Sequence, residues 1–193
     1  MNFLAHIYLS GEDDLLKIGN FMADGIRYTE FHQFPERVVD GIYLHHKIDL
    51  FTDTHPITKA SKDRLFNIYG HYAAVIVDMY YDHFLAKNWH RYHTEQLEKY
   101  VQSFYDLLYR NHSILSSKAQ YLLPHMQENN WLVSYRTIDG LGKIMTQMDE
   151  RRTSNRSRMR YADQELRKYY RDFEQEFFDF FEELVQYVTT INK

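Results

Sequence analysis

The C-terminal part of the chain carries apolar side chains, mostly aromatic, at intervals of three and four residues, and this spacing constrains the fold more than any other feature. The stripe consists of Leu166, Tyr169, Tyr170, Phe173, Phe177, Phe180, Phe181, Leu184 and Val188. Such intervals repeat one face of an α-helix, and acidic residues fill the opposite face. The pattern predicts a final amphipathic helix whose aromatic face is buried in the core.

The rest of the chain also favours helices. Its 193 residues are 44% hydrophobic and include only seven glycines and three prolines, so residues that break helices are scarce. No segment alternates convincingly like a β-strand. Helices are expected near 12–28, 36–52, 56–69, 71–90, 94–110 and 116–128, and from about 161. We therefore predict an all-α fold, formed as a single helical domain over residues 1–193.

Three residues indicate where helices begin. Ser10 stands three positions before Asp13, a spacing that can cap the helix expected near 12–28. Pro35 suits the first turn of the helix near 36–52, and Pro56 can open the helix that follows.

Composition excludes several classes of protein. The chain has no cysteine, so a bound metal needs nitrogen and oxygen ligands and no disulfide can form. No run of 18 apolar residues occurs, and the N-terminal segment MNFLAHIYLSGEDD lacks a basic region, so we expect neither a signal peptide nor a membrane span, and a cytoplasmic protein. The net charge of −4 disfavours nucleic-acid binding. The oligomeric state is left open.

The segment GIYLHHKIDLFTDTH, residues 41–55, places ionisable groups among apolar ones. On a helical wheel one stripe contains Ile42, His46, Asp49, Leu50 and Asp53, and His45 lies beside Asp49. Histidine and aspartate therefore share a face with residues that should point into the core. Asp53 is also a candidate N-cap for the helix opened by Pro56.

A second helix shows the same conflict. Its stripe contains Val75, Asp78, Tyr81, Asp82, Leu85 and Trp89, and His83 follows Asp82 directly. Asp78 and Asp82 lie one turn apart, so their charges repel. Burying a lone carboxylate costs several kcal/mol or more. These acids must be protonated, paired with bases or bridged by a cation, and a thiol-free set of histidines and carboxylates suits Mn²⁺, Fe²⁺, Zn²⁺ or Mg²⁺.

Six motifs in order resemble the bacterial acyl carrier protein phosphodiesterases. They are MNFLAHIYLS at 1–10, GNFMADGIR at 19–27, GIYLHHKID at 41–49, FTDTHP at 51–56, DMYYDHFLAKNW at 78–89 and WLVSYRTIDG at 131–140. The resemblance covers most of the chain and is strongest before residue 90.

This resemblance implies a helical fold distantly related to the HD-type metal-dependent phosphohydrolases. It also implies hydrolysis of the phosphodiester that joins 4′-phosphopantetheine to a serine of holo-acyl carrier protein, with Mn²⁺ as the preferred ion and Mg²⁺ or Fe²⁺ as alternatives. The usual HD dyad of histidine followed by aspartate is absent here, because Asp82 and His83 stand in the reverse order. The ligands must therefore be inferred from this chain's own stripes.

For metal-assisted hydrolysis we assign roles from these stripes. The expected ligands are His46, Asp49, Asp78 and Asp82. Asp24 is a further ligand or the base that orients the attacking water. The candidates for a general acid, or for contacts that orient the ligands, are His6, His45 and His83.

Basic residues are expected to bind the substrate. Arg27 and Lys47 lie close in sequence to the carboxylates and are expected to hold phosphate oxygens. The segment ERRTSNRSRMR, residues 150–160, carries five arginines, and a basic surface would attract an acidic carrier protein. The residues expected to bind that partner are Arg136, Arg151, Arg152, Arg156 and Arg158.

Two other functions fit the same residues. The first is a metal phosphohydrolase of this fold that acts on nucleotides, although no diagnostic base-binding motif is present. The second is a non-catalytic helical protein that binds an acidic partner through residues 150–160, with its buried acids satisfied by histidine and lysine.

Overall fold

A computed structural model of the chain describes residues 1–153 and 156–191, with the backbone alone for 151–153. Within these ranges the chain forms α-helices and short 3-10 helices and no strand, so the all-α prediction is confirmed. The α-helices are α1 (Phe3–Leu9), α2 (Asp14–Met22), α3 (Glu36–Thr54), α4 (Pro56–Tyr69), α5 (Ala73–Lys87), α6 (Leu97–Arg110), α7 (Ser117–Glu128), α8 (Trp131–Ser134), α9 (Ile138–Thr153), α10 (Ala162–Lys168) and α11 (Tyr170–Ile191). The 3-10 helices are η1 (Tyr28–Gln33), η2 (Gly70–Tyr72), η3 (Trp89–Arg91), η4 (His112–Ile114) and η5 (Met159–Tyr161).

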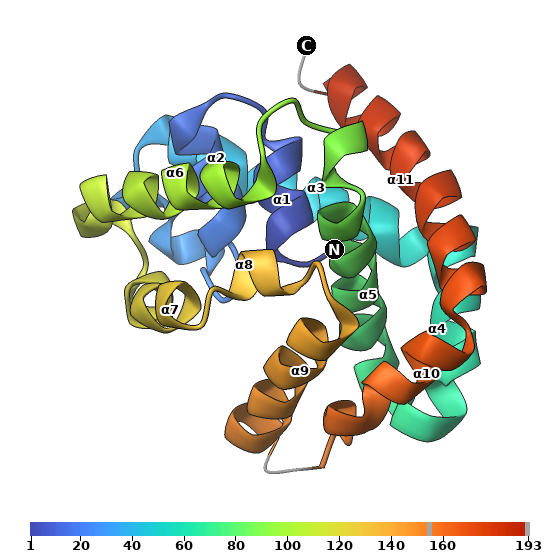
Figure 1. Cartoon of the computed structure of the whole chain (residues 1–193). Coiled ribbons are helices and arrows are strands. Elements are labelled where there is room, and N and C mark those ends of the chain that lie inside the picture. Colours follow the sequence, from blue (N-terminus) through green and yellow to red (C-terminus); the bar gives the residue numbers. More distant parts are fainter. Residues whose placement is uncertain (154–155, 192–193) are drawn as a thin grey trace.

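The aromatic stripe forms one side of the core, as predicted. Helix α11 runs along the edge of the molecule beside α4 and α5 (Figure 1). Its buried residues are Phe173, Phe177, Phe180, Phe181, Leu184 and Val188. The expected last helix is interrupted at Tyr169, whose ψ angle of 29° separates α10 from α11. Hydrophobic spacing did not predict this break, because the stripe continues through it.

The structure corrects the expected start and end of the helix near 12–28. Asp13 caps α2, since its side chain accepts a hydrogen bond from the Leu16 amide at 2.9 Å, whereas the Ser10 hydroxyl donates to the carbonyl of His6. The helix ends at Met22, and Gly25 follows with a φ of +88°, outside the helical range. The predictions for the two prolines are confirmed, because Pro35 directly precedes α3 and Pro56 is the first residue of α4.

Two glycines let α2 and α3 approach closely. A Cβ atom on Gly19 would lie 2.0 Å from the carbonyl oxygen of Val38, and one on Gly41 would lie 2.2 Å from that of Leu16. No side chain fits at such distances, so the helices pack backbone to backbone. This contact brings the carbonyl of Asn20 in α2 within hydrogen-bonding distance of His45 in α3.

Helix α1 lies near the centre of the molecule, beside α2 and α5 (Figure 1). Its first turn is held by Asp82 of α5, whose two carboxylate oxygens accept hydrogen bonds from the amides of Leu4 at 2.7 Å and Ala5 at 3.2 Å. These amides have no partner within the helix, and a carboxylate at a helix N-terminus is favourable. Burial raises the pKa of Asp82 to about 7, although these two bonds favour its charged form.

In residues 1–153 and 156–191, no helix combines the length and apolar character needed to cross a membrane.

Candidate metal centre

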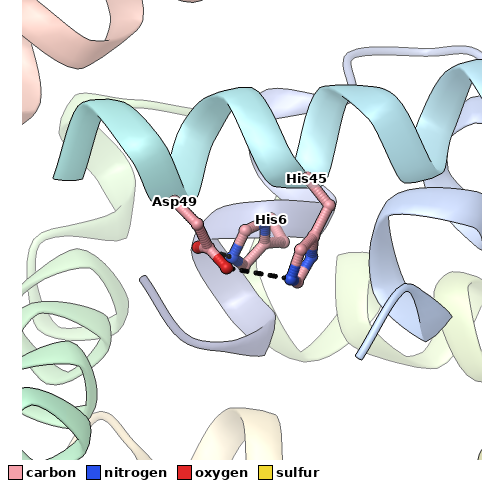
Figure 2. Close-up of side chains that lie close together, drawn as sticks. All are labelled: His6, His45 and Asp49. Carbon is pink, nitrogen blue, oxygen red and sulfur yellow. Dashed lines mark ion pairs between the residues drawn. The ribbon is translucent and has the colours of Figure 1, made fainter. Parts of the chain in front are cut away.

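Helices α1 and α3 bring two histidines and one carboxylate together (Figure 2). The Nε2 atom of His6 lies 3.2 Å from Oδ1 of Asp49, and Nε2 of His45 lies 3.1 Å from Oδ2 of the same residue. The imidazole rings stack with centroids 4.0 Å apart. One ligand atom from each of the three side chains falls within 4.8 Å of the others, a group that can hold a metal ion.

Asn20 fixes which nitrogen of His6 carries the proton. The Asn20 amide group donates to the carbonyl of His6 and to the hydroxyl of Ser10, each at 2.9 Å. Its oxygen must therefore accept, and the partner is Nδ1 of His6 at 2.7 Å. In neutral His6 the Nδ1 atom thus bears the hydrogen, and a lone pair on Nε2 faces Asp49.

His45 is oriented in the same way by the backbone of Asn20. Its Nδ1 atom lies 2.8 Å from the Asn20 carbonyl oxygen, which can only accept a hydrogen bond. In the neutral ring the Nε2 lone pair therefore faces Asp49. The Nε2 atom also lies 3.4 Å from Oδ1 of Asp24. Hydrogen bonds to Nδ1 commonly orient histidine ligands of metal ions in this manner.

A cation is required where these lone pairs meet carboxylate oxygens. Burial lowers the pKa of His45, but hydrogen bonds to Asp24 and Asp49 outweigh this effect and raise the pKa to about 9, so a proton can supply that cation. Burial and the neighbouring His45 charge lower the pKa of His6 to about 4, which keeps His6 neutral. Among the described residues, the hydrogen-bonding neighbours of His6 Nε2 are acceptors, namely Asp49 and the carbonyl of Met1, each at 3.2 Å. A bound divalent ion would satisfy both nitrogens at once.

Asp24 and Lys118 form the open side of the centre. The Asp24 side chain is exposed, and its contact with His45 lowers its pKa to about 2. The Lys118 ammonium donates to the Asp24 carbonyl at 3.0 Å and lies 3.9 Å from its carboxylate. A pocket of about 340 Å³ borders both residues. Substrate can therefore approach from this side.

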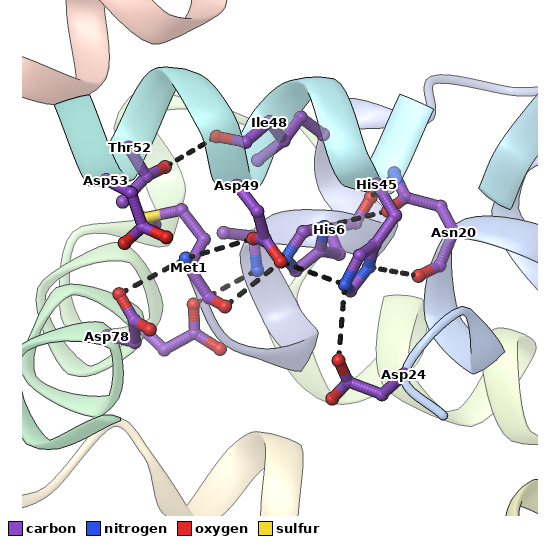
Figure 3. Close-up of polar contacts among 12 residues, drawn as sticks. Met1, His6, Asn20, Asp24, His45, Ile48, Asp49, Thr52, Asp53 and Asp78 are labelled. Atoms are coloured by element: carbon purple, nitrogen blue, oxygen red, sulfur yellow. Dashed lines mark hydrogen bonds and ion pairs between the residues drawn. The ribbon is translucent and has the colours of Figure 1, made fainter. Parts of the chain in front are cut away.

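Asp78 lies on the inner side of the centre, beyond the amino group of Met1 (Figure 3). That ammonium group is 3.2 Å from Oδ1 of Asp78 and 3.6 Å from Oδ1 of Asp49. Burial raises the pKa of Asp78, and the ammonium offsets part of this effect. The charge of Met1 thus separates the acid on α5 from the acid on α3.

The remaining sequence-predicted ligands and acids lie elsewhere. Asp82 holds the first turn of α1, as described above. His83 is buried with its Nδ1 atom 2.7 Å from the Tyr135 carbonyl and its Nε2 atom 3.1 Å from the Tyr170 hydroxyl. His46 is exposed, because it follows His45 by about 100° around α3. The structure thus groups Asp49 with His6 and His45.

The cations expected to bind phosphate do not reach the two histidines. Arg27 is 83% exposed and lies 3.5 Å from Glu30. Lys47 is exposed and lines a separate groove of about 820 Å³, which is bordered by α3, the connection from α1 to α2 and the end of α11. Asp53 does not cap α4, because it pairs with Lys62 at 2.7 Å while His55 occupies the N-cap position.

The basic segment is described only in part. The side chains of Arg151 and Arg152 lie outside the described residues. Arg156 and Arg158 are exposed, and Arg136 pairs with Glu98 at 2.6 Å on the surface. In the same segment, Arg160 bonds the buried Asp149 at 2.8 Å, so part of this charge serves the fold.

Sequence reasoning did not identify three groups at this centre as functional. A signal for Asn20 was present, since a polar side chain stands inside the apolar run IGNFM of residues 18–22. Lys118 gave no signal, because its position beside Asp24 depends on how α7 packs. The place of the Met1 amino group follows from the path of the chain into α1.

Comparisons with known proteins identify the family of the chain. A family model for acyl carrier protein phosphodiesterase matches residues 1–184. The acyl carrier protein phosphodiesterase of Photorhabdus laumondii is 30% identical over 182 residues, which cover 94% of this chain and 91% of that protein. The enzyme of the same name from Pectobacterium atrosepticum is 25% identical over 98% of both chains. No solved structure matched. The chain belongs to the acyl carrier protein phosphodiesterase family.

Proposed function

We propose that this protein hydrolyses the phosphodiester of holo-acyl carrier protein, releasing 4′-phosphopantetheine and leaving the serine of the apo-carrier. The observation that carries the proposal is the convergence of two oriented Nε2 lone pairs on one carboxylate, in a chain of this family. Hydrolysis of such an ester requires a nucleophilic water and neutralisation of the phosphoryl oxygens.

The residues that would hold the metal are His6, His45 and Asp49. Nitrogen and carboxylate ligands without a thiol suit Mn²⁺, with Mg²⁺ or Fe²⁺ as alternatives. When bound, the ion supplies a Lewis acid and makes water nucleophilic near neutral pH. His45 must lose its extra proton on binding, so metal uptake releases a proton.

Asp24 is assigned to the attacking water, and Lys118 is assigned to the phosphoryl group. The Asp24 carboxylate is exposed and lies 3.4 Å from Nε2 of His45, so it can orient the attacking water and accept its proton. The Lys118 ammonium lies beside it and can hold a phosphoryl oxygen. This assignment gives no role at the reacting groups to Arg27, Lys47 or His83.

The carrier protein is proposed to dock through the exposed arginines. Carrier proteins are acidic, and Arg156 and Arg158 present positive charge at the surface after α9. Replacing Arg158 with glutamate should raise KM for holo-carrier with little change in kcat, and added salt should reduce the difference. A selective loss of kcat would contradict a docking role.

We propose a distant relation to the HD-type phosphohydrolases. It is supported by an all-helical fold that places histidine and aspartate on facing helices. A cytoplasmic location is proposed on the same terms, since the substrate class and the absence of cysteine fit that compartment.

The test is a direct assay of release. Holo-carrier is incubated with the protein and Mn²⁺, and intact mass spectrometry follows the loss of 4′-phosphopantetheine, with a chelator-treated sample as control. Release that depends on added metal supports the proposal. Turnover of nucleotides without release from the carrier, or binding of the carrier without turnover, would overturn it in favour of the nucleotide hydrolase or the adaptor.

A further inference from the structure

A second pocket, of about 230 Å³, lies between α7 and α9 and is not part of the metal centre. Its lining is largely apolar and consists of Lys118, Tyr121, Leu122, His125, Trp131, Gln147 and Met148. Four of these residues recur at three- and four-residue steps along α7 and therefore share one face of that helix. Tyr121 is 69% exposed, so this side of the pocket is open to solvent.

Two polar atoms of the residues that line this pocket lack partners. Neither Nε1 of Trp131 nor Oε1 of Gln147 has a hydrogen-bond partner among the residues that the structure describes, although both atoms are buried. The Trp131 side chain is 7% exposed. The other tryptophan, Trp89, donates its indole N–H to the carbonyl of Glu95 at 2.9 Å. An unpaired buried donor or acceptor destabilises the fold, so one of each at a single pocket calls for a ligand that pairs with them.

The missing partners define the chemistry of such a ligand. An indole N–H donates to a carbonyl oxygen, and a glutamine oxygen accepts from an N–H. A secondary amide offers both groups, and apolar walls suit the methylene and methyl groups on either side of it. The pantetheine arm contains secondary amides joined by short aliphatic segments, and it carries no charge.

Helix α7 borders both this pocket and the side of the metal centre formed by Asp24 and Lys118. Lys118 and Leu122 line this pocket and also a narrow gap bordered by Asp24. From Lys118 to His125 the helix rises by about 10 Å. A substrate whose phosphate lies beside Asp24 and Lys118 can therefore extend its arm along α7.

We infer that the pocket between α7 and α9 binds the pantetheine arm of the substrate, with Trp131 and Gln147 pairing with one of its amides. The inference rests on the proposed function. Both polar atoms are buried, so pairing with them requires rotations of the Trp131 and Gln147 side chains. Apolar packing holds the arm, and the amide contacts fix how far it enters.

The first experiment measures binding without turnover. In a Trp89→Phe background Trp131 is the remaining tryptophan, and its fluorescence is titrated with pantetheine, which lacks the phosphate. We expect a saturable change, weakened by about 2- to 10-fold in Gln147→Leu, the loss expected for one hydrogen bond. Lys143→Leu, an exposed substitution on α9 outside the pocket lining, is the matched control. No saturable change, or equal affinity in both variants, would overturn the inference.

The second experiment separates this inference from the proposed function. Trp131→Phe keeps most of the ring and removes the unpaired donor, so stability should be unchanged or higher. Its KM for holo-carrier should rise by about 2- to 10-fold, while hydrolysis of bis(p-nitrophenyl) phosphate with Mn²⁺ stays the same. If wild-type protein releases phosphopantetheine and Trp131→Phe has an unchanged KM, this inference fails alone. If wild-type protein releases none, the proposed function fails, whereas the fluorescence titration still tests the pocket.

Discussion

His6 and His45 stack face to face with ring centroids 4.0 Å apart, and each presents Nε2 to a different oxygen of Asp49. Two protonated imidazoles in this position would repel strongly, which agrees with a pKa of about 9 for His45 and about 4 for His6. The pair can hold one proton, or both rings can share one divalent ion. Because both rings face Asp49, we expect metal binding to depend most on this residue.

Replacing Asp49 with asparagine should remove metal binding. The amide is neutral, so the two Nε2 lone pairs lose the anion that completes the site. We expect Mn²⁺ affinity to fall by at least about 100-fold, since loss of contacts outside the ligands already costs 10- to 100-fold. Release of phosphopantetheine should fall with it. Calorimetric titration with Mn²⁺ and intact mass spectrometry of the carrier measure the two effects.

Asp53→Asn is the matched control for Asp49. It makes the same change of charge one turn further along α3, on a side chain that is 67% exposed and pairs with Lys62. We expect its Mn²⁺ affinity and turnover to match the wild-type protein. Wild-type metal affinity in Asp49→Asn would remove Asp49 from the ligand set.

Asn20 should affect metal affinity by orienting His6, although Asn20 is not itself a ligand. Asn20→Leu removes the amide oxygen that accepts from Nδ1 of His6, so the ring is free to rotate or change its protonated nitrogen. We expect Mn²⁺ affinity to fall by about 10- to 100-fold while the stoichiometry of binding is kept. A titration at higher metal concentration should restore turnover. Unchanged affinity would show that packing alone orients His6.

Much of the fold followed from helical spacing, because the stripe in α11 reports burial residue by residue. Helical spacing did not predict the break at Tyr169, because the apolar pattern continues through it. It also did not predict the end of α2 at Met22, which depends on the residues that follow. Local spacing also identified Asp49 and His45 as neighbours one turn apart. It could not place His6, which reaches them only because α1 is inserted beside α2 and α5.

The acids of α5 illustrate the limit of the same reasoning. Their spacing correctly indicated that Asp78 and Asp82 share a face, and burial without a partner suggested an ion. The structure shows that Asp82 instead accepts hydrogen bonds from the amides of Leu4 and Ala5, and that Asp78 contacts an ammonium group. Backbone donors and chain termini leave no mark in a hydrophobic pattern, so compensation of this kind is invisible in the sequence.

Asp82 should therefore contribute more to stability than to metal binding. Asp82→Ala leaves the Leu4 and Ala5 amides unpaired in the core, and we expect the free energy of unfolding to fall by about 2–3 kcal/mol. Urea denaturation with a chelator present measures this loss. Calorimetric titration of the folded variant should give near wild-type Mn²⁺ affinity. Loss of metal binding in fully folded protein would return Asp82 to the ligands predicted from the sequence.

His83 should make stability depend on pH. Burial lowers the pKa of His83 from 6.5 to about 4, and the nearby Lys87 charge lowers it further. Between these two pH values His83 is therefore neutral in the folded protein and protonated in the unfolded chain. The contribution of His83 is present above pH 6.5 and is lost as the pH falls toward 4. Between pH 7 and pH 5 the loss amounts to about 2 kcal/mol.

His83→Gln isolates this effect, because the glutamine amide can still donate to the Tyr135 carbonyl and does not titrate. The raised pKa of Asp82 acts in the opposite direction, but it does so in both proteins and cancels in the comparison. In urea denaturation with a chelator, the wild-type protein should lose about 2 kcal/mol more than the variant between pH 7 and pH 5. Parallel pH profiles of stability in the two proteins would refute this account of His83. In a turnover assay, a drop in kcat with normal folding would support the role of general acid predicted from the sequence.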